Sequence, residues 1–195
     1  LVQMFDKLID GWFKRHISTS AMAEGTKNED PTAQKFAAMD FVLQFYEVGL
    51  LTWDEANYIA VSPDGIAWVK VPGDEHQDQE KQLAVVEIKT RTKPKTIAKA
   101  EKARDAVMAQ SVSGDGRVVV CEYNDKVFKT CVPSSNRKQV IHQALVTGLT
   151  WGVFITAKVE EGQGSIVQIV FVHFSEDQKR EYSRVLLRMA KPLAS

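Results

Sequence analysis

Residues 83–90 read LAVVEIKT, an apolar run that finishes on polar and charged residues. A continuous run of aliphatic residues of this length is typical of a strand buried inside a sheet. Side chains two positions apart in a strand project from the same face, so Glu87 and Lys89 point together while Ile88 points to the opposite face. A buried strand has no packing reason to carry two charges on one face. The polar end of this strand is therefore the first candidate for a functional site.

A surface ion pair is the alternative explanation of this acid-x-lysine triplet, and the chain contains a second triplet for comparison. Residues 177–179 read DQK and begin two residues after Ser175, which can cap a helix. Acidic residues in the first turn of a helix interact favourably with its dipole, which accounts for Asp177 without any catalytic role. Only the triplet at Glu87 follows an apolar strand.

Helices and strands are predicted along the chain on both sides of this strand. Helices are expected over residues 1–16, from Thr26 or Pro31 to about Gly49, over 96–111, from Ser134 or Ser135 to Gly148, and from a capping box at 175–178 to about Ala190. Strands are expected over residues 58–61, 66–71, 83–90, 117–123, 126–132, 151–159 and 165–174. This pattern predicts an α/β (α+β) fold, a sheet covered by helices, in a single domain over residues 1–195.

Two turn sequences are expected to join neighbouring strands into hairpins. Residues 62–65 read SPDG between the strands at 58–61 and 66–71, and Asn124-Asp125 separates the strands at 117–123 and 126–132. If the first turn brings Asp64 beside Glu87, two carboxylates and the ammonium of Lys89 share one pocket.

Such a pocket has the chemistry of a divalent-cation site. Carboxylate oxygens are the ligands that Mg²⁺ and Mn²⁺ prefer, and the bound cation lowers the pKa of water and neutralises phosphate charge. Asp64 and Glu87 are the expected ligands, with the backbone carbonyl of Ile88 as an additional one. Lys89 would position or deprotonate the attacking water and offset the charge of the transition state.

Four segments in this order resemble the PD-(D/E)xK nuclease superfamily, and within it the lambda-exonuclease or YqaJ-type viral recombinase group. They read GTKNE at residues 25–29, SPDG at 62–65, EIK at 87–89 and QVIHQALVTG at 139–148. The resemblance implies a restriction-endonuclease-like mixed β-sheet flanked by helices and a Mg²⁺-dependent deoxyribonuclease in which Mn²⁺ can substitute. It also implies site roles for a helix carboxylate at Glu29, metal-binding Asp64 and Glu87, catalytic Lys89, and Gln139 near the active site.

Some of these residues have a second explanation. Glu29 also fits a helix capping box with Thr26, and a solvated helix edge accounts for Gln143. The group typically has a second glutamine where this chain has Ile141, and the interval between residues 17–20 and Glu29 is short. Exonuclease and endonuclease action therefore both stay open.

Basic residues gather directly after the candidate catalytic strand. The chain carries 25 Lys and Arg against 25 Asp and Glu, so a positive field over the whole molecule is excluded and any affinity for nucleic acid must be local. A basic run is usually a solvated surface, but this one adjoins the proposed phosphodiester site. The residues expected to contact DNA phosphates are Arg91, Lys93, Lys95, Lys99 and Lys102.

The remaining composition predicts an intracellular protein, in the cytoplasm or the nucleus. No apolar run approaches the roughly 18 to 20 residues of a membrane span, and Cys121 and Cys131 are expected to be reduced core thiols. Two functions stay in competition: a metal-dependent DNA nuclease, and a catalytically inactive nucleic-acid-binding or protein-interaction domain of the same fold. A homo-oligomer is compatible with either.

Overall fold

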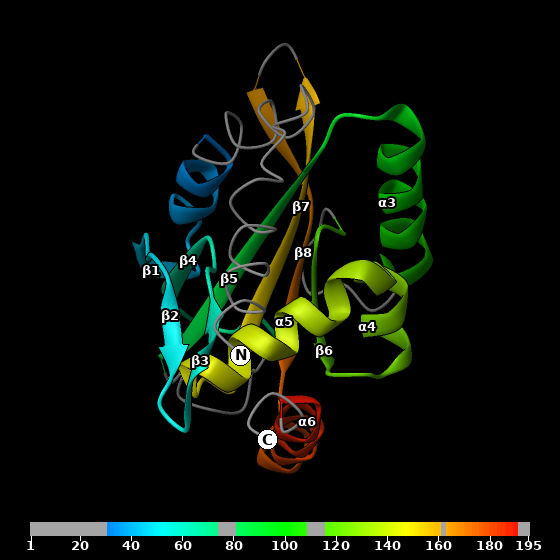
Figure 1. Ribbon diagram of the computed structural model, residues 1–195. Coiled ribbons are helices and arrows are strands. Elements are labelled where there is room, and N and C mark those ends of the chain that lie inside the picture. Colours follow the sequence, from blue (N-terminus) through cyan, green and yellow to red (C-terminus); the bar gives the residue numbers. More distant parts are fainter. Residues whose placement is uncertain (1–30, 74–80, 109–115, 161–162, 191–195) are drawn as a thin grey trace, which may run out of the picture.

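A six-stranded mixed sheet forms the centre of the fold (Figure 1). The computed structural model describes residues 31–73, 81–108, 116–160 and 163–190. The strand order is β1-β4-β5-β7-β8-β6, with parallel pairing between β5 and β7 and between β6 and β8. The strands of this sheet are β1 (Val42–Tyr46), β4 (Gly65–Val69), β5 (Gln82–Arg91), β6 (Val118–Glu122), β7 (Trp151–Glu160) and β8 (Gln163–His173). The predicted α/β architecture, a mixed sheet flanked by helices, is confirmed.

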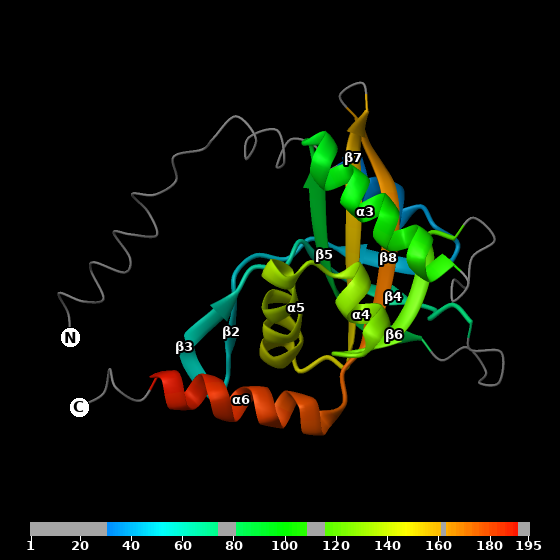
Figure 2. The same ribbon diagram turned by 90° about the vertical axis from the view of Figure 1, so that its right-hand side faces the viewer.

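Helices lie on both sides of this sheet in Figure 1, and Figure 2 shows the sheet from one of these two sides. They are α3 (Pro94–Val107), α4 (Lys126–Cys131), α5 (Ser134–Thr147) and α6 (Glu176–Ala190), together with a helical turn over residues 31–37. Val85 of β5 packs with Phe154 and with the core side chains of α4 and α5, whereas Ile88 packs with Phe36 on the opposite face. The alternation of β5 therefore directs Glu87 and Lys89 toward the face that carries α5. Among the described helices, none is long and apolar enough to cross a membrane.

The central strand β5 loses one of its two neighbours part-way along its length. It pairs in parallel with β7 from Ala84 to Arg91, but its antiparallel pairing with β4 runs only from Gln82 to Val86. Beyond Val86 no described strand pairs with the side of β5 that faces β4. The EIK triplet lies within this segment.

The predicted helix from residue 26 or 31 to about Gly49 is wrong in its second half. Residues 31–37 are helical and Phe36 is fully buried, but residues 42–46 form β1, which pairs antiparallel with β4 at the edge of the sheet. Leu43 and Tyr46 are each 41% exposed, so their helical spacing reflects no shared buried face. Pairing with the sheet overrides the local periodicity here.

The SPDG segment is also not a hairpin turn. Strand β3 (Ala56–Val61) pairs with β2 (Leu51–Trp53), a strand that the sequence pattern did not predict, in a separate two-stranded sheet. The next strand, β4, belongs to the six-stranded sheet. Residues 62–64 therefore form a crossing between two sheets, and this crossing delivers Asp64 to β5.

The predicted hairpin around residues 124–125 is half right, because β6 is followed by the helix α4. The Asp125 side chain accepts a hydrogen bond of 2.6 Å from the Phe128 amide and caps the helix, while Asn124 adopts a φ of 69°. An aspartate N-cap satisfies an amide that a hairpin would leave to the partner strand. Cys131 in α4 and Cys121 in β6 are both free and buried, as predicted.

Replacing Asp125 by Ala is expected to lower the free energy of unfolding by about 0.5 to 2 kcal/mol, because the capping bond to Phe128 is lost. Asp177→Ala is the matched control, since Asp177 makes only an exposed ion pair with Arg180 in the first turn of α6. Urea denaturation of both variants measures the difference. Equal and small effects at the two positions would argue against the capped helix α4.

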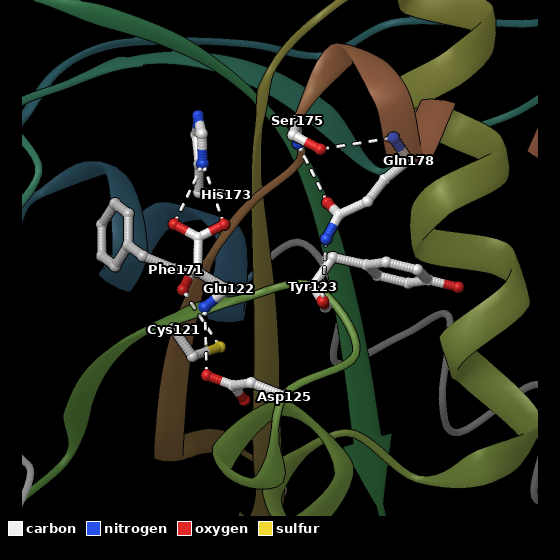
Figure 3. Close-up of polar contacts among 8 residues, drawn as sticks. All are labelled: Cys121, Glu122, Tyr123, Asp125, Phe171, His173, Ser175 and Gln178. Atoms are coloured by element: carbon white, nitrogen blue, oxygen red, sulfur yellow. Dashed lines mark hydrogen bonds and ion pairs between the residues drawn. The ribbon is translucent and has the colours of Figure 1, made fainter. Parts of the chain in front are cut away.

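The predicted capping box at the start of α6 is confirmed (Figure 3). The Gln178 amide donates to the Ser175 hydroxyl at 3.3 Å, and the Ser175 amide donates to the Gln178 side-chain oxygen at 2.9 Å. The side-chain nitrogen of Gln178 donates in turn to the Tyr123 carbonyl at 3.2 Å. This cap therefore also connects α6 to the segment after β6.

Candidate functional site

Asp64, Glu87 and Lys89, which we call the acid–lysine cluster, meet where β4 separates from β5. The Asp64 amide donates to the Val86 carbonyl at 3.1 Å, and the Asp64 Oδ2 accepts a hydrogen bond of 2.6 Å from the Ile88 amide. The Asp64 side chain thus occupies the place of a strand partner on the free side of β5. Lys89 Nζ forms an ion pair with Glu87 Oε1. The structure therefore brings together three residues that the sequence separates by up to 25 positions.

Two glutamines of α5 donate hydrogen bonds to the carboxylate of Glu87. Gln139 Nε2 donates to Glu87 Oε1 at 2.7 Å, and Gln143 Nε2 donates to Glu87 Oε2. The glutamines are four residues apart and share one helix face. The structure corrects the interpretation of Gln143 as a solvated helix edge, because its side chain is only 1% exposed. Its place one turn after Gln139 was the signal in the sequence that pointed to this role.

Burial dominates the electrostatics of the two carboxylates. Glu87 is 2% exposed, and its pKa is raised by burial and by the nearby Asp64 charge, against the opposing effects of Lys89 and Gln143. The pKa of Asp64 is also raised by burial, against the lowering effects of the Ile88 amide and of Lys89. Both carboxylates are therefore less readily ionised than in water. A cation placed between them would favour the ionised forms.

The donor set of the cluster fits a hard divalent cation. Mg²⁺ is commonly held in proteins by one or two carboxylates while it keeps several of its waters. Within the described ranges no group of three or more His, Cys, Asp and Glu side chains gathers at one place, so the cluster itself supplies two carboxylates, Asp64 and Glu87, while Glu47 lines the hollow beside Asp64. Glu29, the third carboxylate expected at the site, lies outside the described residues. A ligand role for the Ile88 carbonyl stays a prediction.

Two hollows adjoin Asp64 and the two glutamines that contact Glu87. One hollow of about 250 Å³ is lined by Asp64, Ser62 and Glu47, and another of about 350 Å³ is lined by Gln139, Gln143 and Ser62. The Lys89 side chain is 25% exposed, in contrast to its ion-pair partner Glu87. A substrate group can therefore reach Lys89 and Asp64 without displacement of the core.

A further polar chain extends from Gln139 toward the end of β5. Asn136 Nδ2 donates to Gln139 Oε1 at 3.5 Å, and Arg91 Nη2 donates to Asn136 Oδ1 at 3.2 Å. These contacts orient the Gln139 amide so that its nitrogen faces Glu87. The structure thus brings Arg91 to the margin of the site. The other predicted phosphate-contacting residues are exposed on α3 or at its N-cap, namely Lys93, Lys95, Lys99 and Lys102.

Replacing Gln143 by Glu is expected to destabilise the protein by about 3 kcal/mol near pH 8, because two buried carboxylates would face each other. The loss is expected to shrink toward about pH 5, as one of the two carboxyl groups takes up a proton. Thermal unfolding at both pH values measures this effect. The same change at Gln34, which is exposed, should alter stability by no more than about 0.5 kcal/mol at either pH. A pH-independent loss in the Gln143 variant would contradict the contact with Glu87.

Comparisons with known proteins agree with the fold. The chain matches no protein-family model and no curated protein. Its structure is similar to the crystal structure of LHK-Exo in complex with dAMP, with a TM-score of 0.51 and 19% sequence identity, over 92% of this chain and 78% of that chain. The chain shares the fold of LHK-Exo. A crystal structure of this alkaline exonuclease from Laribacter hongkongensis also aligns, with a TM-score of 0.46 and 18% identity, over 90% of this chain and 77% of that chain.

Proposed function

We propose that this protein is a divalent-cation-dependent nuclease that hydrolyses phosphodiester bonds in DNA. The observation that carries the proposal is the meeting of Asp64, Glu87 and Lys89 at the free side of β5, where one lysine and two partly desolvated carboxylates lie together and Asp64 lines an open hollow. The ordered motifs that resemble the PD-(D/E)xK superfamily support it. The fold shared with LHK-Exo, an alkaline exonuclease with a dAMP complex, supports it as well.

Each residue of the cluster has a distinct task in this proposal. Asp64 and Glu87 bind Mg²⁺ or Mn²⁺, which supplies charge neutralisation and an acidified water when bound. Gln139 and Gln143 hold the Glu87 carboxylate in one orientation, so no reorganisation is needed when substrate binds. The Lys89 ammonium can donate a hydrogen bond to the attacking water or to a phosphate oxygen and thereby offset negative charge that develops there.

The competing function is a DNA-binding domain without catalysis. Such a domain would use the basic residues after β5 and would gain nothing from the acid–lysine cluster. The repulsion between Asp64 and Glu87 contributes to the raised pKa of Glu87. Two neighbouring carboxylates are an unfavourable arrangement unless a cation binds between them. The cluster therefore favours the enzyme over the binding domain.

A cleavage assay separates the two functions. The purified protein is incubated with plasmid, linear duplex and single-stranded DNA, and with RNA, in the presence of Mg²⁺, Mn²⁺ or a chelator. We expect metal-dependent loss of DNA that the chelator abolishes. The pattern of products distinguishes terminal digestion from internal cuts. DNA binding without cleavage under any metal would favour the inactive domain instead.

A further inference from the structure

A pocket separate from the acid–lysine cluster opens between α3, the end of α4 and the beginning of α5. Its volume is about 300 Å³, and β5 contributes one wall through Arg91. We call it the basic pocket, because its walls carry the side chains of Arg91, Lys99, Lys129 and Arg137, with the hydroxyls of Ser134 and Ser135 among its other lining groups. None of the described residues that line it is acidic.

The basic pocket is lined by four cationic side chains and by no carboxylate of the described residues. The Arg137 guanidinium is fixed by hydrogen bonds to the carbonyls of Val132, at 2.8 Å, and of Lys129. The Arg91 side chain is half-buried, and this burial lowers its pKa. Partly desolvated guanidinium groups bind a phosphate or carboxylate more strongly than solvated ones do. The pocket therefore has the charge of an anion site.

The beginning of α5 adds backbone donors to this pocket. Ser134 and Ser135, where the sequence predicts the start of this helix, do not cap it: Pro133 is the N-cap residue, and no described side chain makes a capping hydrogen bond. Ser134 and Ser135 instead form the first turn, inside the lining of the basic pocket. The first amides of a helix have no intrahelical acceptor and lie at the positive end of the helix dipole, where anions bind.

We propose that the basic pocket binds a phosphate group of the nucleic-acid strand that enters the acid–lysine cluster. This inference rests on the proposed function for the identity of the strand. Arg91 follows Lys89 by two residues on the same face of β5, and its bond to Asn136 leads to Gln139 and so to Glu87. Residues of β5 and α5 thus connect the basic pocket to the cluster. A strand bound in the pocket is directed along β5 toward Lys89.

The lysines of α3 and α4 differ in whether they line the basic pocket. Of the lysines on α3 only Lys99 lines the pocket, whereas Lys95 and Lys102 do not. On α4 the same contrast holds between Lys129, which lines the pocket, and Lys126, which does not. All four lysines are exposed, so their replacement leaves the core unchanged. The chain therefore offers a matched pair of double variants.

The test compares Lys99→Gln/Lys129→Gln with Lys102→Gln/Lys126→Gln. Each double variant removes two positive charges from the same two helices, and circular dichroism verifies the fold of both. Binding of a fluorescent DNA duplex is measured by anisotropy in chelator, so that cleavage does not interfere. We expect the Kd of the pocket variant to rise about 10-fold and that of the control to rise about 2-fold. The slope of log Kd against log salt should fall by about one more in the pocket variant.

Two duplexes, with a terminal 5′-phosphate and with a 5′-hydroxyl, identify the phosphate. A pocket effect on both assigns an internal phosphodiester, and an effect confined to the first assigns the terminal phosphate. Equal losses of affinity in the two double variants on both duplexes would overturn the proposal. Equal losses together with intact metal-dependent cleavage would reject phosphate binding in the basic pocket and leave the proposed nuclease activity in place. The absence of cleavage with a pocket-specific binding loss would reject the nuclease alone.

Discussion

Replacement of Lys89 by Met is expected to lower the rate of metal-dependent DNA cleavage by about 10²- to 10⁴-fold, the range for a group that transfers or stabilises a proton in a transition state. Methionine keeps the unbranched stem of lysine but cannot donate a hydrogen bond or carry charge. Because Lys89 is 25% exposed, the fold should tolerate the change. Single-turnover cleavage of a linear duplex at saturating Mg²⁺ measures the chemical step.

The matched control for this experiment is Lys126→Met. Lys126 is exposed on α4 and lines neither the hollows beside the cluster nor the basic pocket. Its cleavage rate should stay within about 2-fold of the wild type, as is usual for an exposed position without a described partner. Full activity in Lys89→Met would remove the ammonium from the mechanism, and a comparable loss in both variants would point to nonspecific electrostatics.

Glu87→Gln is expected to produce the second large effect, a loss of cleavage of at least about 10³-fold, because the cation loses one of its two described carboxylates. The variant keeps the shape of the side chain. The buried Gln143 Oε1 has no hydrogen-bond partner among the described residues, so a flip of the Gln143 amide lets it accept from the new amide. The loss of activity should therefore occur in a folded protein, which the melting temperature verifies.

The same variant has a distinctive pH dependence. In the wild type the pKa of Glu87 is raised in the folded state, mainly by burial. Such a carboxyl group is less destabilising when protonated, so the wild type loses stability as pH rises from the unfolded-state pKa through the folded-state pKa. Glu87→Gln lacks this titration. Its melting temperature should approach that of the wild type near about pH 4 and exceed it near about pH 8.

The control for the pH profile is Glu181→Gln, at an exposed position of α6. Its melting temperature should follow that of the wild type across the same pH range, since a substitution at an exposed position usually changes stability little. A Glu87 variant that is less stable than the wild type near pH 8 would show that the ion pair with Lys89 outweighs the burial of the carboxylate. That outcome would contradict the raised pKa.

The parts of the fold that the sequence predicted are those with strong local signals. The apolar run before Glu87 marks β5, the serine and glutamine of the capping box mark the start of α6, and Gly148 ends α5 with a φ of 71°. Each of these signals acts within a few residues of its position. The acid and lysine residues at the end of β5 were identified for the same reason, since the apolar strand around them excludes an ordinary surface pair.

The features that the sequence did not predict depend on contacts between distant segments. β1 exists because β4 offers an edge, and the exposed spacing of Leu43 and Tyr46 mimics a helix. β2 consists of three residues, too few for a periodicity. The burial of Gln143 depends on the packing of α5 against β5, and its spacing from Gln139 alone fits a solvated helix edge as well as a buried one.

The separation of β4 from β5 after Val86 also limits how the chain can vary. Asp64 contacts the Ile88 amide from a connection of only three residues between two different sheets. This connection therefore has no residue to spare. Removal of one residue between Val61 and Gly65 would draw the carboxylate away from β5 even with the aspartate retained. The length of this linker is therefore as strictly determined as the identity of the acid that it carries, and tolerance to insertions and deletions should fall to a minimum there.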